Sequence, residues 1–346
     1  MISFTCDYTQ GAHPEILRRL AETNLQQEEG YGMDSFSEQA RQKIKAATGC
    51  SDADVFFLVG GTQTNATVID ALLQRHQGVV AVETGHIAVH EAGAIEATGH
   101  KVITLPAHEG RMWACDLTAY LRAFYDDPTW PHMVVPGMVY LSFPTEYGTL
   151  YSRQQLADIH NICRQYNLPL FIDGARLGYA LASPMADINL PGLASLCDVF
   201  YIGGTKVGAL CGEAVVFPRG DAPKHFFTLI KQHGALLAKG RLLGIQFDTL
   251  FTHDLYLDIS RHAIQMAMRL KNAFTARGIE LFIDSPTNQQ FPILTTAQAE
   301  AIGRQVAFEV WQPLPGGRLV TRFATSWATP PEHIDILEHL LDEAGA

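Results

Sequence analysis

Short apolar runs alternate with amphipathic stretches between about Ala53 and Phe217, and this alternation restricts the chain to a small set of folds. Runs that are apolar on both faces and separated by helices are typical of a mainly parallel sheet covered on both sides. A further run after Gly212 is a candidate antiparallel strand. The strand candidates are residues 55–59, 79–82, 101–105, 138–141, 170–172, 199–202 and 214–217.

The C-terminal part of the chain has a different pattern. A chain of 346 residues is too long for one ordinary core. We therefore predict an α/β fold with a large domain over residues 1–250, which includes an N-terminal arm, and a smaller C-terminal α+β domain over residues 251–346. The elements expected in the smaller domain are a helix at 254–277, a mixed region that contains 288–294 and 318–323, and a helix near 334–341.

Charge and composition exclude several classes of protein. The net charge of −11 at pH 7 argues against a nucleic-acid partner, which requires a basic face. No apolar run approaches the roughly 18 residues of a membrane span, and the first residues lack the pattern of a signal peptide. Six widely spaced cysteines without a C-x-x-C pair indicate reduced thiols in a cytoplasmic protein, and they lack the spacing of metal ligands.

Two short motifs end neighbouring apolar runs. Asp173 and Arg176 close the stretch Phe171-Ile172-Asp173-Gly174-Ala175-Arg176, and Lys206 closes Tyr201-Ile202-Gly203-Gly204-Thr205-Lys206. An amine, an acid and an arginine at this edge of a sheet suit pyridoxal phosphate (PLP) chemistry. Lys206 can form the Schiff base, Asp173 can hold the pyridine nitrogen protonated, and Arg176 can bind a substrate carboxylate. We therefore predict a PLP enzyme.

A small-residue turn follows the first strand candidate. Gly61, Thr62 and Gln63 come directly after this strand, and a helical pattern begins there. Backbone N–H groups at such a turn can bind a phosphate, and the helix dipole favours its charge. The Gly-Lys-Ser/Thr ending of a Walker loop is missing. We predict that this turn holds the cofactor phosphate, and that Thr205 beside Lys206 also contacts the cofactor.

Taken together, the motifs resemble the low-specificity L-threonine aldolase family. The resemblance runs from residues 31–34 to residues 325–328. It implies a PLP-dependent transferase-like fold of fold type I, close to the aromatic amino acid β-eliminating lyases. The motifs that carry it are Gly61-Thr62-Gln63-Thr64-Asn65, Gly85-His86-Ile87, Asp173-Gly174-Ala175-Arg176 and Gly204-Thr205-Lys206.

The resemblance assigns roles to two histidines. It implies that His86 stacks on the pyridine ring and assists proton transfer, and that His132 lies near the substrate's hydroxyl. His86 and His90 are four residues apart, but Ile87 stands where the zinc-protease pattern requires Glu, so no metal is predicted. We interpret His90 as structural.

Other residues are implied to bind the substrate or to act across a subunit interface. Arg318 matches a second carboxylate-binding arginine, although Arg322 is close enough in sequence to compete for that role. Tyr31, and the basic stretch with Lys239 and Arg241, match residues that the partner subunit provides in the family. A homodimer or a homotetramer made of two dimers is therefore expected.

Two positions depart from the pattern of the family. Phe143 stands where relatives often have a polar side chain, and Val207 stands where close relatives often carry Asn. Neither change removes essential chemistry. Both leave the substrate open, and Phe143 could favour a bulky or aromatic β-substituent.

The predicted reaction is PLP-dependent cleavage of L-threonine, L-allo-threonine or a related β-hydroxy-α-amino acid to glycine and an aldehyde. The first alternative is β-elimination from an aromatic or sulfur amino acid. A more distant alternative is a non-catalytic binding module with this fold. A nicotinamide-binding sheet is disfavoured because no G-x-G-x-x-G follows the first strand candidate. The sequence leaves the β-carbon stereochemistry, the subunit number and any monovalent cation open.

Overall fold

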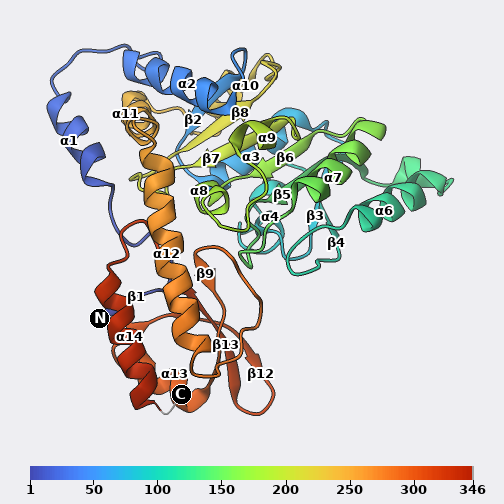
Figure 1. Cartoon of the computed structure of the whole chain (residues 1–346). Helices are drawn as coiled ribbons and strands as arrows, with labels where there is room; N and C mark the ends of the chain where they lie inside the picture. The colour runs from blue at the N-terminus through green and yellow to red at the C-terminus, as the bar shows by residue number, and fades with distance from the viewer. Residues whose placement is uncertain (345–346) are drawn as a thin grey trace.

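The computed structural model describes residues 1–344, and it has a large upper part and a smaller lower part (Figure 1). The long helix α12 (Leu255–Thr275) runs from one part to the other. Both the strand-rich upper part and the mixed lower part agree with the predicted α/β class.

The upper part is built on a seven-stranded sheet with the order β2-β8-β7-β6-β5-β3-β4. β8 runs antiparallel to both of its neighbours, and the remaining pairs are parallel. The seven predicted strands, and the antiparallel direction of the last one, are therefore confirmed. The strands are β2 (Asp54–Leu58), β3 (Gln77–Val82), β4 (Val102–Leu105), β5 (Val135–Ser142), β6 (Leu170–Asp173), β7 (Val199–Gly203) and β8 (Glu213–Phe217).

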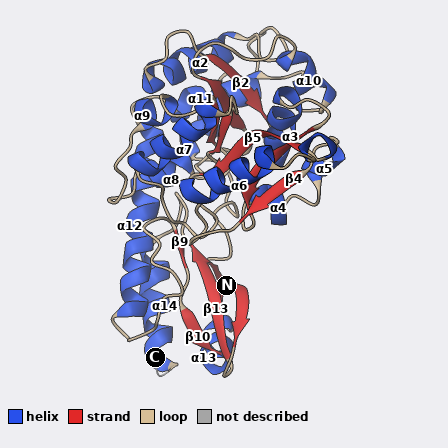
Figure 2. Cartoon of the chain, turned by 90° about the vertical axis from the view of Figure 1, so that its right-hand side faces the viewer, coloured by secondary structure: helices blue, strands red, loops and turns tan. Residues whose placement is uncertain are grey.

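Both faces of this sheet are buried, which explains why its strands are continuous apolar runs. In β3, Val80 and Val82 join the core cluster on one face, while Val79 and Ala81 join the cluster on the other. Successive side chains of a strand point to opposite faces, so a doubly covered strand must be apolar throughout. Figure 2 shows helices on both sides of the red strands.

The helices of the upper part begin where the sequence provides suitable caps. Asp34 accepts a hydrogen bond from the Ser37 N–H at the start of α2, and Ser152 forms a capping box with Gln155 at the start of α7. The helices are α1 (Pro14–Glu22), α2 (Ser35–Thr48), α3 (Gly61–Leu72), α4 (His86–Val89), α5 (Ala94–Ala97), α6 (Ala114–Asp126), the 3₁₀ turn η1 (Trp130–His132), α7 (Arg153–Gln165), α8 (Leu177–Leu181), α9 (Leu190–Ala194), α10 (Phe226–Gln232) and α11 (Arg241–Leu250).

The lower part combines small sheets with helices, and the start of the chain belongs to it structurally. β1 (Ile2–Ser3) pairs in parallel with β11 (Val306–Ala307), and Phe4 packs in the same cluster as Phe323. The division at residue 250 stays a prediction, but the N-terminal strand lies against the C-terminal part. The other elements here are β9 (Gln289–Gln290), β10 (Ile293–Thr295), α13 (Thr296–Gly303), β12 (Glu309–Leu314), β13 (Arg318–Ala324) and α14 (Pro331–Glu343).

Membrane-spanning helices are not found in this fold. Within residues 1–344, every helix is either too short or too polar to cross a bilayer.

Candidate active site

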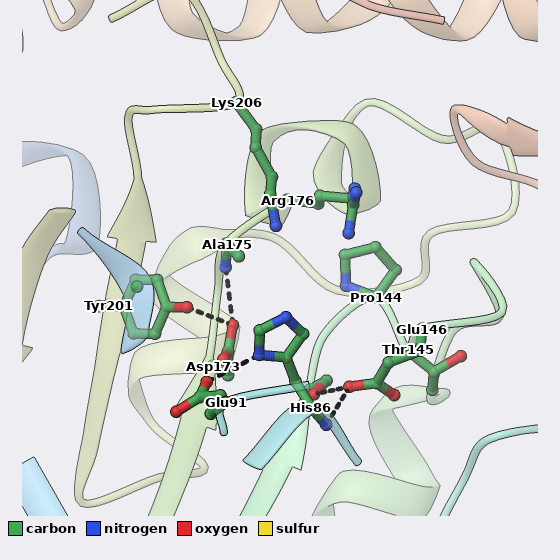
Figure 3. Close-up of a pocket in the computed structure, with 12 residues that line it drawn as sticks. His86, Glu91, Pro144, Thr145, Glu146, Asp173, Ala175, Arg176, Tyr201 and Lys206 are labelled. Atoms are coloured by element: carbon green, nitrogen blue, oxygen red, sulfur yellow. Dashed lines mark hydrogen bonds and ion pairs between the residues drawn. The ribbon is translucent and has the colours of Figure 1, made fainter. Parts of the chain in front are cut away.

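Five of the predicted site residues line one cavity at the carboxyl edge of the central sheet (Figure 3). Asp173 is the last residue of β6, Lys206 follows β7, Gly61 begins α3, His86 begins α4, and Arg176 precedes α8. The strands before these segments point in the same direction, so their carboxyl ends meet at one edge. The cavity and its opening to solvent together enclose about 410 Å³ of space that no protein atom occupies.

The carboxylate of Asp173 is held in a polar network. It accepts hydrogen bonds from the hydroxyl of Tyr140 at 2.6 Å, from the hydroxyl of Tyr201 at 2.5 Å and from the amide of Asn65 at 3.0 Å. Burial alone would raise the pKa of Asp173, but His86 and the two tyrosine hydrogen bonds outweigh it and lower this pKa. An ionised acid is therefore fixed at the edge of the cavity, where it could pair with a protonated ring nitrogen.

Lys206 lies in a turn that Glu213 organises from β8. Thr205 Oγ1 donates to one carboxylate oxygen of Glu213 at 2.8 Å, and the Gly204 N–H donates to the other at 3.1 Å. The Thr205 hydroxyl, which was predicted to contact the cofactor, is used inside this turn. Burial and the charge of Arg176 lower the pKa of the Lys206 amine, which favours a nucleophilic lysine. Burial raises the pKa of Glu213 to about 8.

His86 is oriented by two buried carboxyl groups. Its Nδ1 lies 2.7 Å from Oε1 of Glu91, which also accepts a hydrogen bond from Asn65 at 2.7 Å. The His86 backbone N–H donates to Glu146 at 2.8 Å, and Ser142 donates to the same oxygen at 2.6 Å. With Glu91 as the acceptor, Nδ1 would carry the proton and Nε2 would be available as a base.

The N-terminus of α3 is open to the cavity and has the features of an anion site. Gly61 lines the cavity, and the residue before it provides no side-chain cap for the first N–H groups of the helix. A Cβ at Gly61 would lie 3.3 Å from the hydroxyl of Tyr201, so the glycine keeps this approach open. Thr62 is exposed here, and Gln63 donates to the carbonyl oxygen of His233 at 3.0 Å.

Arg176 is paired with an acid from the N-terminal segment. Its Nε donates to Oδ2 of Asp7 at 2.6 Å, and its Nη2 donates to Oδ1 at 2.9 Å. Asn288 donates to Asp7 at 2.9 Å. Asp7 is fully buried, and the charges of Arg176 and Lys206 outweigh its burial and lower its pKa. Arg176 therefore lines the cavity as the partner of the ionised Asp7 in a hydrogen-bonded ion pair.

The structure separates the two candidates for the second arginine. Arg318 begins β13, is exposed, and pairs at 3.2 Å with Glu280, which is also exposed. Arg322 lies four residues further along the strand, about 13 Å closer to the cavity end. Only 13% of its side chain is exposed, it pairs with Glu309 and donates to the carbonyl oxygen of Thr5 at 3.2 Å, and burial and the charge of Arg176 lower its pKa. Arg322 is therefore the better-placed candidate for binding a carboxylate, and the role of Arg318 stays a prediction that its position does not support.

His132 lies at the opposite edge of the sheet, away from the cavity of its own chain, so its predicted place at the substrate's hydroxyl has no contact to support it. It is exposed and ends the η1 turn just before β5 begins. The cavity contacts Ser142 at the other end of the same strand. Eight residues of extended chain separate the two edges by about 25 Å.

The residues predicted to act across a subunit interface do not line the cavity of their own chain. Tyr31 is 43% exposed, and its ring lies 4.4 Å from Nζ of Lys231. Lys239 is exposed before α11, whereas Arg241 donates to two backbone carbonyl oxygens after α1. The cross-subunit roles of Tyr31 and Lys239 stay predictions, and Arg241 has a structural role inside its own chain.

The two departures from the family pattern lie in the core. Phe143 is 1% exposed and Val207 is fully buried, and neither lines the cavity. Pro144 lines it instead, so the expected effect of Phe143 on the β-substituent has no contact to support it. His90 packs between His86 and the small sheet, with ring centroids 5.8 Å apart in the histidine pair. Residues 1–344 contain no cluster of three or more His, Cys, Asp or Glu arranged for a metal.

A family model described as beta-eliminating lyase matches residues 4–296 of the chain. The chain belongs to the beta-eliminating lyase family. Among solved structures, it is similar to a threonine aldolase from Leishmania major, with 41% identity, full coverage of both chains and a TM-score of 0.97. It is also 29% identical over 335 residues to the low specificity L-threonine aldolase of Pseudomonas aeruginosa, which covers 96% of this chain and 94% of that relative.

More distant members of the fold are found among aminotransferases. An aspartate aminotransferase from Thermus thermophilus superimposes with a TM-score of 0.71 at 14% identity, over 99% of this chain and 96% of the other. At this identity the likeness establishes the fold alone. The predicted fold type I and the resemblance to the threonine aldolases are thus confirmed.

The residues of this beta-eliminating lyase family member fit a bound PLP. Gly61 and the uncapped start of α3 suit the phosphate, and Asp173 suits the ring nitrogen. His86 lies on the cavity wall beside Asp173, and Lys206 reaches the cavity from the far side (Figure 3). The chemistry of each group therefore matches one part of the cofactor.

Sequence reasoning missed several residues that hold the site together. Glu91, Tyr140 and Tyr201 contact the catalytic candidates directly, and Asp7 and Glu213 fix Arg176 and the Lys206 turn. Glu91 could have been noticed because a carboxylate five residues after a ring-stacking histidine can return to it across one helical turn. Asp7 could not, because 169 residues separate it from Arg176.

Proposed function

We propose that this chain is a PLP-dependent aldehyde-lyase that cleaves L-threonine, L-allo-threonine or a related β-hydroxy-α-amino acid to glycine and an aldehyde. The observation that carries the proposal is the His86–Glu91 pair in the same cavity as Asp173 and Lys206. The pair adds a candidate base to a cavity whose other groups would suit any amino-acid substrate. The Leishmania and Pseudomonas relatives are named threonine aldolases, which supports this choice.

Substrate recognition follows from the charges around the cavity. Arg176, with support from Arg322, would bind the α-carboxylate, and the carboxylate's position would direct the Cα–Cβ bond toward His86. Lys206 would bind the cofactor covalently, and Asp173 would hold its ring nitrogen protonated. When bound, PLP supplies an electron sink for the pair that remains on Cα.

The proton of the β-hydroxyl requires a base, and His86 is placed for it. Nε2 would accept this proton while Nδ1 stays bonded to Glu91. The Cβ–O bond then becomes the carbonyl of the aldehyde as the Cα–Cβ bond breaks. Return of a proton to Cα completes glycine, and the ionised Glu91 stabilises the imidazolium that forms in between.

The assembly proposed for this enzyme is a homodimer or a homotetramer made of two dimers. Tyr31 and Lys239 lie exposed outside the cavity of their own chain, and they would reach the cavity of a second copy. The six cysteines are free thiols, which fits the proposed cytoplasmic location.

An absorbance spectrum of the purified protein, followed by a coupled assay, tests the function. L-Allo-threonine is added with alcohol dehydrogenase and NADH. A visible band from lysine-bound cofactor together with NADH oxidation supports the aldolase. A protein that shows no such band after PLP is added contradicts the cofactor and every role assigned to Lys206.

The same sample distinguishes β-elimination, which the name of the family model favours as the second candidate. β-Elimination releases pyruvate and ammonia, and lactate dehydrogenase with NADH detects the pyruvate. Pyruvate from an aromatic or sulfur amino acid, without aldehyde from either threonine isomer, would replace the aldolase assignment.

A further inference from the structure

Asp7 holds Arg176 from the side and leaves one nitrogen of the guanidinium unused. The two hydrogen bonds involve Nε and Nη2, and no partner for Nη1 is found among residues 1–344. Arg176 lines the cavity, whereas Asp7 does not. The acid therefore fixes the plane of the guanidinium and leaves Nη1 for a ligand.

The segment that carries Asp7 is anchored on both sides. Before it, the Phe4 N–H donates to the carbonyl oxygen of Ala307, and the Ala324 N–H donates to that of Phe4, both at 2.8 Å. After it, the His13 N–H donates to the carbonyl oxygen of Gly208, near Lys206, also at 2.8 Å. The segment thus connects the lower part of the molecule to the cavity of the upper part.

The same three residues, Thr5 to Asp7, hold both arginines. Arg176 comes from the upper part and binds the Asp7 carboxylate, while Arg322 comes from β13 in the lower part and binds the Thr5 carbonyl oxygen. Arg322 also donates to the side chain of Gln289 at 3.3 Å. Arg322 also forms an ion pair with Glu309. One short segment therefore contacts two arginines that the fold brings from different parts of the chain.

Charge gives the segment a second effect. Arg176 and Arg322 are both largely buried, and burial together with the charge of Arg176 lowers the pKa of Arg322. Two desolvated cations repel each other, and the ionised Asp7 between the segments offsets that repulsion. Arg322 also has an ion pair with Glu309, so a ligand with one carboxylate meets two arginines that are each already partly neutralised by an acid.

We propose that segment Thr5–Asp7 determines carboxylate recognition in this enzyme, with Asp7 as the positioning residue that orients Arg176 for the α-carboxylate of the amino acid. The inference rests on the proposed function for the class of ligand. In this proposal Asp7 is not an inhibitory group that occupies the position of the substrate carboxylate on Arg176. A third contact, from Asn288, keeps Asp7 in place and outside the cavity wall.

The test compares binding of glycine and of glycinamide, which lacks the carboxylate charge, to the cofactor-loaded protein by calorimetry. Asp7→Asn keeps the shape of the side chain and removes its charge. Asn288→Ala removes one hydrogen bond to Asp7 and serves if the first variant does not fold. Glu280→Gln, at the exposed pair with Arg318, is the matched control.

Asp7→Asn should weaken glycine binding at least about tenfold, since it removes the buried partner of Arg176, and it should leave glycinamide binding within about twofold. Asn288→Ala should change the glycine-to-glycinamide ratio in the same direction by less, and Glu280→Gln should leave it unchanged. Tighter glycine binding in Asp7→Asn would show that Asp7 competes with the ligand carboxylate for Arg176, and it would overturn the proposal.

Two other results also overturn it. Equal losses for both ligands would mean that Asp7 only supports the fold, and an unchanged ratio would mean that Asp7 does not orient Arg176. The wild-type protein separates this inference from the function on which it rests. If it binds glycine no better than glycinamide, the assignment of Arg176 and the amino-acid substrate both fail, whatever Asp7 does.

Discussion

Nδ1 of His86 lies 2.7 Å from the buried carboxylate of Glu91. The contact fixes which ring nitrogen carries the proton and directs the other nitrogen toward the cavity. Asn65 extends the connection, because its amide donates both to Glu91 and to Asp173. The candidate base and the candidate partner of the ring nitrogen are therefore held by one hydrogen-bonded network.

Replacement of His86 by Asn should lower kcat for aldehyde release by about 10² to 10⁴-fold, the usual contribution of a general base. Glu91→Gln should lower kcat in the same direction, because a neutral amide no longer stabilises the imidazolium or fixes the tautomer. The measurement is a pH profile of kcat with alcohol dehydrogenase coupling. Glu96→Gln, on the exposed side of α5, is the control. A Glu91→Gln profile identical to that of the wild type would remove Glu91 from the mechanism.

The two arginines of β13 give opposite expectations. Arg322→Leu should raise KM by at least about tenfold, because a buried cation near Arg176 is lost. Arg318→Leu should change kcat and KM by less than about threefold, since its exposed pair with Glu280 contributes little. Steady-state kinetics with L-allo-threonine decide between them. A larger effect from Arg318 than from Arg322 would restore the assignment made from sequence.

The buried carboxyl of Glu213 predicts a pH-dependent stability. Its pKa rises from the ordinary 4.5 to about 8 in the folded protein, so between these values the folded state binds the proton more tightly than the unfolded state. The stabilisation is fully present below about pH 4.5 and is lost as the pH rises through about 8. Urea unfolding should show that the free energy of unfolding falls as the pH rises from about 4.5 to about 8 and levels off above that.

Glu213→Gln is the matched variant for this expectation. The amide keeps an acceptor for Thr205 Oγ1 but does not titrate. The variant should therefore lose part of the pH dependence of unfolding over the same range. A wild-type free energy of unfolding that increases with pH, while that of the variant stays flat, would give the wrong sign and contradict the burial argument.

Lys206→Ala should abolish the visible band of lysine-bound cofactor and the release of aldehyde together. The reason is that Lys206 is the lysine on the cavity wall, where burial and Arg176 lower its pKa. Lys224→Ala, in an exposed loop, should retain both signals. The measurement is an absorbance spectrum with the coupled assay on each protein. Full turnover by Lys206→Ala would exclude the scheme.

Much of the fold could be predicted because its strands are buried on both faces. Residues 79–82 must be apolar at each position when helices cover both sides of β3, and such runs are visible in one sequence. The turns after β6 and β7 were also visible. Gly174 is needed because a Cβ there would overlap the carbonyl oxygen of Tyr201 in β7, and Gly203 because a Cβ there would overlap the backbone of Ala175 in the turn after β6.

Two predicted site residues, Arg318 and His132, lie away from the cavity for the same physical reason. Arg318 and Arg322 differ by four positions in one strand, and His132 and Ser142 lie at opposite ends of another. Sequence pattern gives the strand and its faces but not which end meets the cavity. That choice depends on how the lower sheet lies against the upper one.

The sequence by itself determined the doubly covered sheet and the Asp173 and Lys206 positions at its carboxyl edge, from which PLP is proposed, because each depends on residues close together in the chain. Only the tertiary structure decided which groups surround them. Asp7 forms hydrogen bonds with Arg176, which is far away in the chain. Glu91 and Glu213 are close in the chain to His86 and to the Lys206 turn, but they contact them only because the chain changes direction in between. Such contacts depend on the packing of the whole chain, which no local pattern records.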